Sequence, residues 1–281
     1  MNGLKSFILI AAMTALLVVV GDLLMPQGHM GAILALGIGL VMNGVSYFFS
    51  DSIVLMMYGA RVVGPQEAPE LHAIVANLAQ RAGLPMPRVA MISEETPNAF
   101  ATGRNPDHAV VAVTSGILRT LSRQELEGVL AHELGHVKHR DILIGSLAAV
   151  LAQAIMFLSH MAIYFTPRDE NDRPNPLAGM LIYFLGPIAA ILLQMAVSRS
   201  REYMADAYAA RLTGRPDMLA SALRRISGYN EQVPMRHAEP ATAHMMIVNP
   251  LSGGGIFSLF STHPPIGKRI ARLEAMPIEA R

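Results

Sequence analysis

One short string of the sequence combines two histidines and a glutamate at a spacing that suits metal chemistry. His132 and His136 lie four residues apart, so a helix places both imidazoles on one face, one turn from each other. Two imidazoles so placed can share one Zn²⁺, and Glu133 on the adjacent face can reach a water on that ion without being a ligand. This HExxH pattern is the signature of zinc peptidases, with the glutamate as general base.

A catalytic zinc site needs a third protein ligand and one open position. His139 is a poor candidate, because seven helical residues separate it from His132 by about 10 Å. A later segment carries Glu202 and Asp206, one turn apart. We predict Glu202 as the third ligand and Asp206 as the group that accepts a hydrogen bond from a ligating histidine and fixes its tautomer. The alternative for this pair is an ordinary solvated acidic face.

Two further residues are candidates for contact with a peptide substrate. A tetrahedral intermediate needs an oxyanion stabiliser besides zinc, and His263 in a Thr-His-Pro-Pro string is our candidate, with a turn histidine between helices as the alternative. Asn98 is a candidate for binding the substrate backbone, and residues 98–102 could pair with an extended peptide. An Asn that follows a proline is also a common turn residue, which is the alternative there.

Long apolar stretches must position these residues. Four stretches carry almost no charge, namely residues 7–24, 30–49, 142–165 and 177–197. Each has about the ~20 residues that a helix needs to cross a bilayer, and we predict four transmembrane helices in two hairpins. A cleaved signal peptide is the alternative for the first stretch, although that run exceeds the usual ~7–15 apolar residues. Buried helices of a soluble core are the alternative for the others.

The composition agrees with a membrane protein. Hydrophobic residues make up 52% and charged residues 15%, against roughly 25% charged residues in typical soluble domains. The net charge of +1 offers no field for a polyanion, so we expect no nucleic-acid partner. The chain has no cysteine, so any metal must be held by His, Asp or Glu. We expect the lipid bilayer and peptide or membrane-protein substrates as partners, whereas the sequence leaves the oligomeric state open.

The distribution of Lys and Arg predicts the orientation. Basic residues flank the stretches on one side, which should be the cytoplasmic side. Both termini and the two polar segments, 50–141 and 198–281, would then lie in the cytosol. The helical rise places the metal roughly 10 Å from the membrane boundary, a depth that suits substrates in or near the membrane.

The polar segments predict a fold that is mainly α with a small β-sheet, an α+β, zincin-like metalloprotease domain beside the four spans. We expect helices over residues 68–83, 198–213, 217–227 and 266–276, and strands over residues 88–92 and 109–114. Ser122 and Glu125 form a capping box that opens the HExxH helix. We expect this helix to run through Arg140 and on into the third apolar stretch.

Taken together, these motifs resemble one known family. The strings HELGHVKHRD, SRSREYMADAYAA, NAFATG and STHPPIGKRIARLE, set around four spans, resemble the HtpX family of membrane zinc metalloproteases, which are relatives of the CAAX prenyl proteases. The resemblance implies a bacterial inner-membrane endopeptidase that acts in quality control of misfolded membrane proteins under stress. It also implies one Zn²⁺ bound by His132, His136 and Glu202, with Glu133 catalytic. Residues 228–256 match none of the motifs.

Two other functions remain open from the sequence. One is a prenyl-type peptidase that trims defined C-termini, although four short spans and a small soluble portion favour the quality-control group. The other is a metal transporter or a scaffold with a structural metal. Transport would favour ligands within the spans, whereas the motif residues lie outside them.

Overall fold

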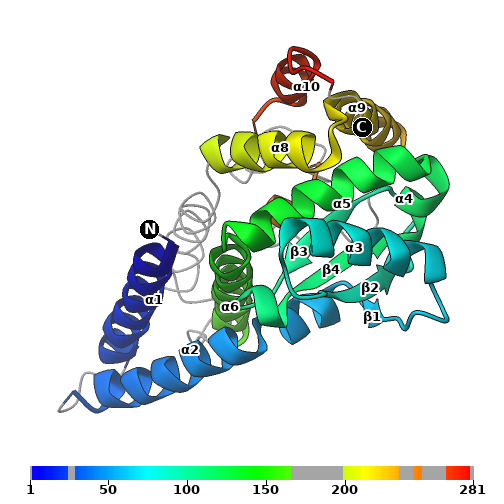
Figure 1. The fold of residues 1–281 in the computed structure, drawn as a ribbon. Coiled ribbons are helices and arrows are strands. Elements are labelled where there is room, and N and C mark those ends of the chain that lie inside the picture. The colour runs from blue at the N-terminus through cyan, green and yellow to red at the C-terminus, as the bar shows by residue number, and fades with distance from the viewer. Residues whose placement is uncertain (1, 25–28, 166–198, 234–242, 249–263, 279–281) are drawn as a thin grey trace.

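The computed structural model describes residues 2–24, 29–165, 199–233, 243–248 and 264–278 (Figure 1). Its helices are α1 (Asn2–Leu24), α2 (Met30–Met57), α3 (Pro69–Ala82), α4 (Ser115–Thr120), α5 (Arg123–Lys138), α6 (Ile142–Phe165), α8 (Arg199–Thr213), α9 (Pro216–Gln232) and α10 (Ile266–Glu274). Its strands are β1 (Arg61–Val62), β2 (Arg88–Ile92), β3 (Ala99–Thr102) and β4 (Val110–Thr114). The described part is thus mainly helical with a small mixed sheet, which confirms the predicted α+β class.

The strands form one sheet in the order β1-β2-β4-β3. Strands β2 and β4 run parallel, while β3 pairs antiparallel with β4 in a register that sets Ala99 opposite Val113. Every residue of β4 is buried, as expected for a strand covered on both faces. This order leaves β3 at one edge of the sheet.

Different helices cover the two faces of the sheet. On one face, alternate residues such as Val111 and Val113 pack in a core with α3, α5, α8 and α9. On the other face, Phe100 and Ala112 pack against Tyr58 from the end of α2 and Ala149 from the start of α6. The rings of Tyr58 and Phe100 lie 5.4 Å apart between centroids. The end of α2 and the first part of α6 therefore belong to the core on this face of the sheet.

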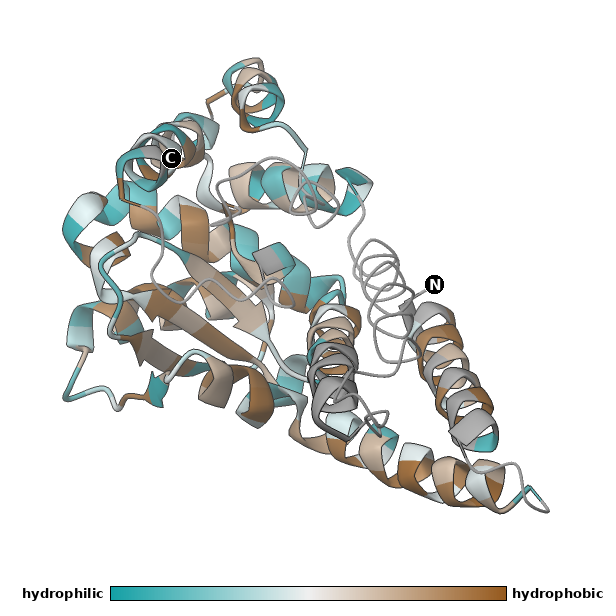
Figure 2. Ribbon diagram, turned by 180° about the vertical axis from the view of Figure 1, so that it is seen from behind, coloured by the Kyte–Doolittle hydropathy of each residue, from teal (hydrophilic) through white to brown (hydrophobic). Residues whose placement is uncertain are grey.

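Helix α2 is made mostly of hydrophobic residues, as the colouring of its ribbon shows (Figure 2), and many of their side chains are exposed. Ile33, Leu40 and Val41 are each more than 60% exposed. The helix also runs beyond the predicted end at residue 49, and its only non-helical backbone angles lie at Phe49, where it kinks before continuing to Met57. The extra turns form because their side chains, such as Val54, are buried against the sheet.

The predicted spans are supported to different degrees. Among the described residues, α2 is the one helix long and apolar enough to cross a membrane, while shorter apolar helical stretches cover Ser6–Val19 and Ile142–Gln153. The predicted span over residues 177–197 lies outside the described residues. Four spans therefore stay a prediction.

The HExxH helix ends earlier than expected. The capping box of Ser122 and Glu125 is present, but α5 ends at Lys138 and Arg140 adopts a left-handed conformation with φ 57°. The backbone N–H of Asp141 then donates to the carbonyl of His136, and α6 begins at Ile142. The prediction of one continuous helix through Arg140 is wrong, because a tight turn that usually carries glycine is made here without one.

Candidate metal centre

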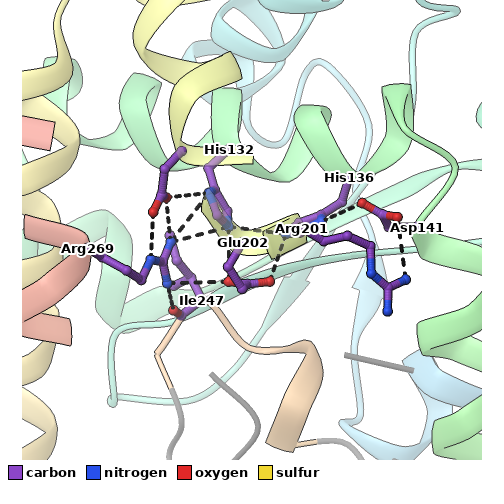
Figure 3. A network of polar contacts seen from close by, with 8 residues as sticks. His132, His136, Asp141, Arg201, Glu202, Ile247 and Arg269 are labelled. Carbon is purple, nitrogen blue, oxygen red and sulfur yellow. Dashed lines mark hydrogen bonds and ion pairs between the residues drawn. The ribbon is translucent and has the colours of Figure 1, made fainter. Parts of the chain in front are cut away.

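Two neighbouring helices bring three donor groups to one point (Figure 3). Helix α5 carries His132 and His136, whose Nε2 atoms lie 3.2 Å apart. Helix α8 carries Glu202, whose Oε2 lies 3.8 Å from Nε2 of His132 and whose Oε1 lies 3.4 Å from Nε2 of His136. Glu202 lies more than sixty positions after the two histidines in the sequence, and the pairing of α5 with α8 brings it beside them.

The spacing of these atoms fits a metal ion. Ligands at about 2.0–2.2 Å from a tetrahedral zinc lie roughly 3.3–3.6 Å from each other. The three donors of His132, His136 and Glu202 lie within 4.8 Å of one another, and all three side chains are largely withdrawn from solvent. Two imidazoles and one carboxylate also form a donor set that divalent transition metals accept. The described residues thus provide a His-His-Glu site able to hold a metal.

Close contact between α5 and α8 depends on Gly135, which lies inside the HExxH string. A Cβ atom added there would lie 3.3 Å from the Cα of Ala205 and 3.2 Å from Cδ1 of Tyr208. Such distances are tighter than ordinary packing, so glycine lets the two backbones approach closely. This approach is what brings Glu202 within reach of the histidines. The role of Gly135 could not be predicted from the sequence, because it depends on how closely α8 packs against α5.

Each histidine is oriented by a carboxylate on its other nitrogen. Oδ1 of Asp206 lies 2.9 Å from Nδ1 of His132, so the group expected to fix a tautomer lies beside one of the candidate donor rings. Oδ2 of Asp141 lies 3.3 Å from Nδ1 of His136. Arg201 lies 3.5 Å from the other oxygen of Asp141. Sequence reasoning missed Asp141, because only the turn at Arg140 folds it back onto the helix.

Burial and neighbouring charges shift the pKa values of the groups in this site. Burial raises the pKa of Glu133 to about 8, with the nearby Glu202 carboxylate adding to the rise. Burial lowers the pKa of His132. Burial alone would also lower the pKa of His136, but the hydrogen bond to Asp141 and the charges of Glu202 and Glu133 outweigh it and raise the pKa to about 9. Perturbed groups gathered in one cavity are typical of catalytic sites.

The donors open onto a small cavity of about 60 Å³. Glu133 lies in its wall without belonging to the donor set, and its carboxylate accepts a hydrogen bond from the backbone N–H of Ala101 on β3. The rest of the wall includes residues from the first turn of α6 and from the segment 244–247, namely Ile142, Gly145, His244, Met245, Met246 and Ile247. The cavity can thus hold a metal ion and a few water molecules beside a buried carboxylate.

The other candidate residues lie elsewhere. Asn98 is fully buried just before β3, where its amide donates to the carbonyl of Val248 and accepts from the N–H of Ala99. Strand β3 has a sheet edge, as the pairing hypothesis requires, but the carbonyl of Ala99 accepts from Ile247. His139 packs against Tyr208, with ring centroids 5.5 Å apart. His263 lies outside the described residues.

Comparisons with known proteins agree with this site. The model of peptidase family M48 matches residues 65–277, which include all three donors. Proteins named "Protease HtpX homolog" from Paraburkholderia phytofirmans and Burkholderia thailandensis are each 54% identical over 278 residues, covering 98% of this chain and 97% of each relative.

A solved structure shares the fold. The crystal structure of S. mikatae Ste24p matches 97% of this chain with a TM-score of 0.52 and 18% sequence identity. This chain covers 65% of that structure, and at this identity the likeness concerns the fold alone. The family match and the relatives decide the classification: the chain belongs to peptidase family M48, is similar to its HtpX members along nearly its whole length, and is a metalloprotease.

Proposed function

We propose that this protein is a zinc-dependent integral-membrane endopeptidase that cleaves misfolded or damaged membrane proteins as part of a stress response. The observation that carries the proposal is the meeting of His132, His136 and Glu202 around one point, with Glu133 beside them in the same cavity. A His₂Glu donor set is typical of catalytic zinc in peptidases. The similarity to proteins named HtpX homologues supports the quality-control role.

The residues divide the chemistry between them. When bound, zinc supplies Lewis acidity to a water and to the scissile carbonyl. Glu133 accepts a proton from the attacking water and passes it to the leaving amine as the C–N bond breaks. Glu133 is buried in the cavity wall, so a proton that it accepts is shielded from bulk solvent and stays available for the leaving amine. Asp206 and Asp141 keep the two imidazoles turned toward the ion.

We also propose the location, a bacterial inner membrane crossed four times with the catalytic part and both termini in the cytoplasm. The spans would be α1, the first part of α2, α6 and residues 177–197. The exposed apolar surface of α2 supports this arrangement. The cavity wall includes Ile142 and Gly145 of the first turn of α6, so the site adjoins a helix that would enter the bilayer. That placement supports membrane proteins as substrates.

Activity measurements on the purified full chain test the proposal. Casein and a model membrane protein should be cleaved, a chelator should stop cleavage, and zinc should restore it. Glu133→Gln is the matched control for contaminating proteases and should be inactive. Cleavage by metal-free protein, or by Glu133→Gln at the same rate, would refute the mechanism.

The substrate class needs its own comparison. The same cleavable segment can be presented in proteoliposomes either as a soluble peptide or within a membrane protein. The membrane-embedded form should be cleaved faster. Equal rates would count against the proposed substrate class while leaving the metallopeptidase intact, and cleavage of a single defined C-terminus would favour the prenyl-type alternative.

A further inference from the structure

An arginine far from the HExxH string in the sequence packs against the metal donors. Arg269 comes from α10, and its side chain is completely buried. Nε and Nη2 of Arg269 donate to the two oxygens of Asp206 at 2.9 and 2.7 Å, while Nη1 donates to the carbonyl of Ile247 at 2.9 Å (Figure 3). Three directed hydrogen bonds from one guanidinium fix its orientation.

The same guanidinium lies close to two of the three metal donors. Nη1 is 3.5 Å from Oε2 of Glu202, and Nη2 is 3.4 Å from both ring nitrogens of His132. Asp206, held by Arg269, is in turn 2.9 Å from Nδ1 of His132. A donor from α5 and a donor from α8 therefore depend on one side chain supplied by the C-terminal helix.

The charges of Glu202 and Asp206 explain why a buried guanidinium is favoured beside them. Glu202 and Asp206 are buried one turn apart on α8, and two buried carboxylates so close together disfavour each other's ionised form. The positive charge of Arg269 between them favours both carboxylates as anions. Oδ1 of Asp206 lies 2.9 Å from Nδ1 of His132, so this carboxylate can accept the Nδ1–H of the ring, which leaves Nε2 free of a proton for the metal.

The third hydrogen bond of Arg269 holds a segment that lines the cavity. Ile247 lines the cavity, and its N–H donates to the carbonyl of Ala99 at the edge of β3. Asn98 holds the next carbonyl, that of Val248. The segment 246–248 is thus anchored against the β3 edge by Asn98 and Arg269, and the position of this cavity wall depends on the same arginine as the metal donors.

We propose that Arg269 is a positioning residue that holds His132 and Glu202 for the metal and the Ile247 wall for the substrate in one arrangement. The inference rests on the proposed zinc-peptidase function and deepens it. Loss of the guanidinium should loosen metal binding through Asp206 and Glu202, and should weaken substrate binding through Ile247. Lysine does not replace it, because a single ammonium cannot match the bidentate fork on Asp206 and reach Ile247 as well.

The test uses the full chain with Arg269→Lys, and Arg272→Gln as the matched control. Arg272 lies on the same helix but is exposed and stacks on Tyr203 at 4.0 Å from the ring centroid. Arg269→Lys should weaken zinc affinity about 10–100-fold, the usual effect of losing a group that orients metal ligands. It should shift the absorption bands of the Co²⁺-substituted protein, and at saturating zinc it should raise KM more than it lowers kcat. Arg272→Gln should leave all three measurements unchanged.

Several outcomes separate this inference from the function itself. Wild-type zinc affinity, cobalt bands and KM in a folded Arg269→Lys protein would overturn the role of Arg269 and leave the metallopeptidase standing. A wild-type protein that neither binds zinc nor cleaves peptides would overturn the function. If Arg269→Lys fails to fold, Asp206→Asn provides the second variant: the inference requires weaker zinc binding and shifted cobalt bands, and unchanged values would overturn it.

Discussion

Oδ2 of Asp141 lies 3.3 Å from Nδ1 of His136, although the two residues would point apart on one continuous helix. The left-handed turn at Arg140 produces this contact. The backbone conformation of a non-glycine residue there costs on the order of 1 kcal/mol or more. The contacts of Asp141 with His136 and Arg201 stabilise the turn in return.

Replacement of this carboxylate should weaken metal binding. Asp141→Asn removes the charge that orients the His136 ring and raises its basicity, so we expect zinc affinity to fall about 10–100-fold. A competition titration with a chelator measures it. Asp217→Asn is the matched control, since Asp217 pairs with Arg215 on the first turn of α9 and lies outside the site. Equal zinc affinities for the two variants would rule out the orienting role.

Substitution of Glu202 and substitution of Glu133 should affect bound zinc differently. Glu202→Ala removes one of three donors, and we expect the protein to lose most of its zinc at concentrations where wild type is saturated. Glu133→Gln should keep its zinc but lose activity by about 10²–10⁴-fold, the usual contribution of a general base. Metal analysis of the purified variants, paired with peptide hydrolysis, checks both. Full metal occupancy in Glu202→Ala would remove it as the third ligand.

Enlarging Gly135 should push α8 away from α5. In Gly135→Ala the new Cβ would lie 3.3 Å from the Cα of Ala205, so we expect weaker zinc binding and a destabilisation of about 1–3 kcal/mol from overpacking. Gly228→Ala on α9 is the control, because a Cβ there has no atom within 4 Å. It should be neutral or stabilising by up to ~1 kcal/mol through helix propensity. Similar thermal stability and zinc affinity in both variants would contradict the packing argument.

Zinc affinity should rise with pH. The pKa of His136 in the metal-free site is raised to about 9, so the ring carries a proton at neutral pH that an incoming ion must displace. Between pH 6 and 8 we expect the apparent affinity to increase about tenfold per pH unit for each proton released. Calorimetry in buffers of different ionisation enthalpy counts those protons. Binding at pH 7 without proton release would show that His136 is already neutral.

His263 gives a prediction that rests on the sequence alone. If it stabilises the oxyanion, His263→Phe should lower kcat by about 10²–10³-fold, with little change in KM or in bound zinc. Steady-state kinetics with metal analysis tests this. A variant with wild-type kcat would leave His263 as a turn residue.

Local signals in the sequence account for the elements that were predicted well. Pro69 near the start and Gly83 at the end bound α3, and the capping box at Ser122 begins α5. Strand β2 matches its prediction because its apolar run is bounded by turn residues. The positions of the metal donors follow from HExxH and from the pairing of two helices.

The features that could not be predicted from the sequence depend on contacts between distant segments. A lone Arg269 in a basic amphipathic helix is typical of a solvated face, and only the packing of α10 against α8 buries it against Asp206. The turn at Arg140 carries no glycine, and the contacts of Asp141 that accompany it become visible only once α8 delivers Arg201. The extension of α2 to Met57 likewise depends on the sheet above it.

Helix α2 is kinked at Phe49 and ends beneath the sheet at Met57. At ~1.5 Å per residue, the part after the kink is a rigid post about 12 Å long. In the proposed membrane arrangement, one continuous helix would join the lipid to the core of the catalytic domain, because the end of α2 packs against the sheet. A tilt of this span would then move the sheet with it, including Ala101 of β3, which lines the same cavity as the metal donors.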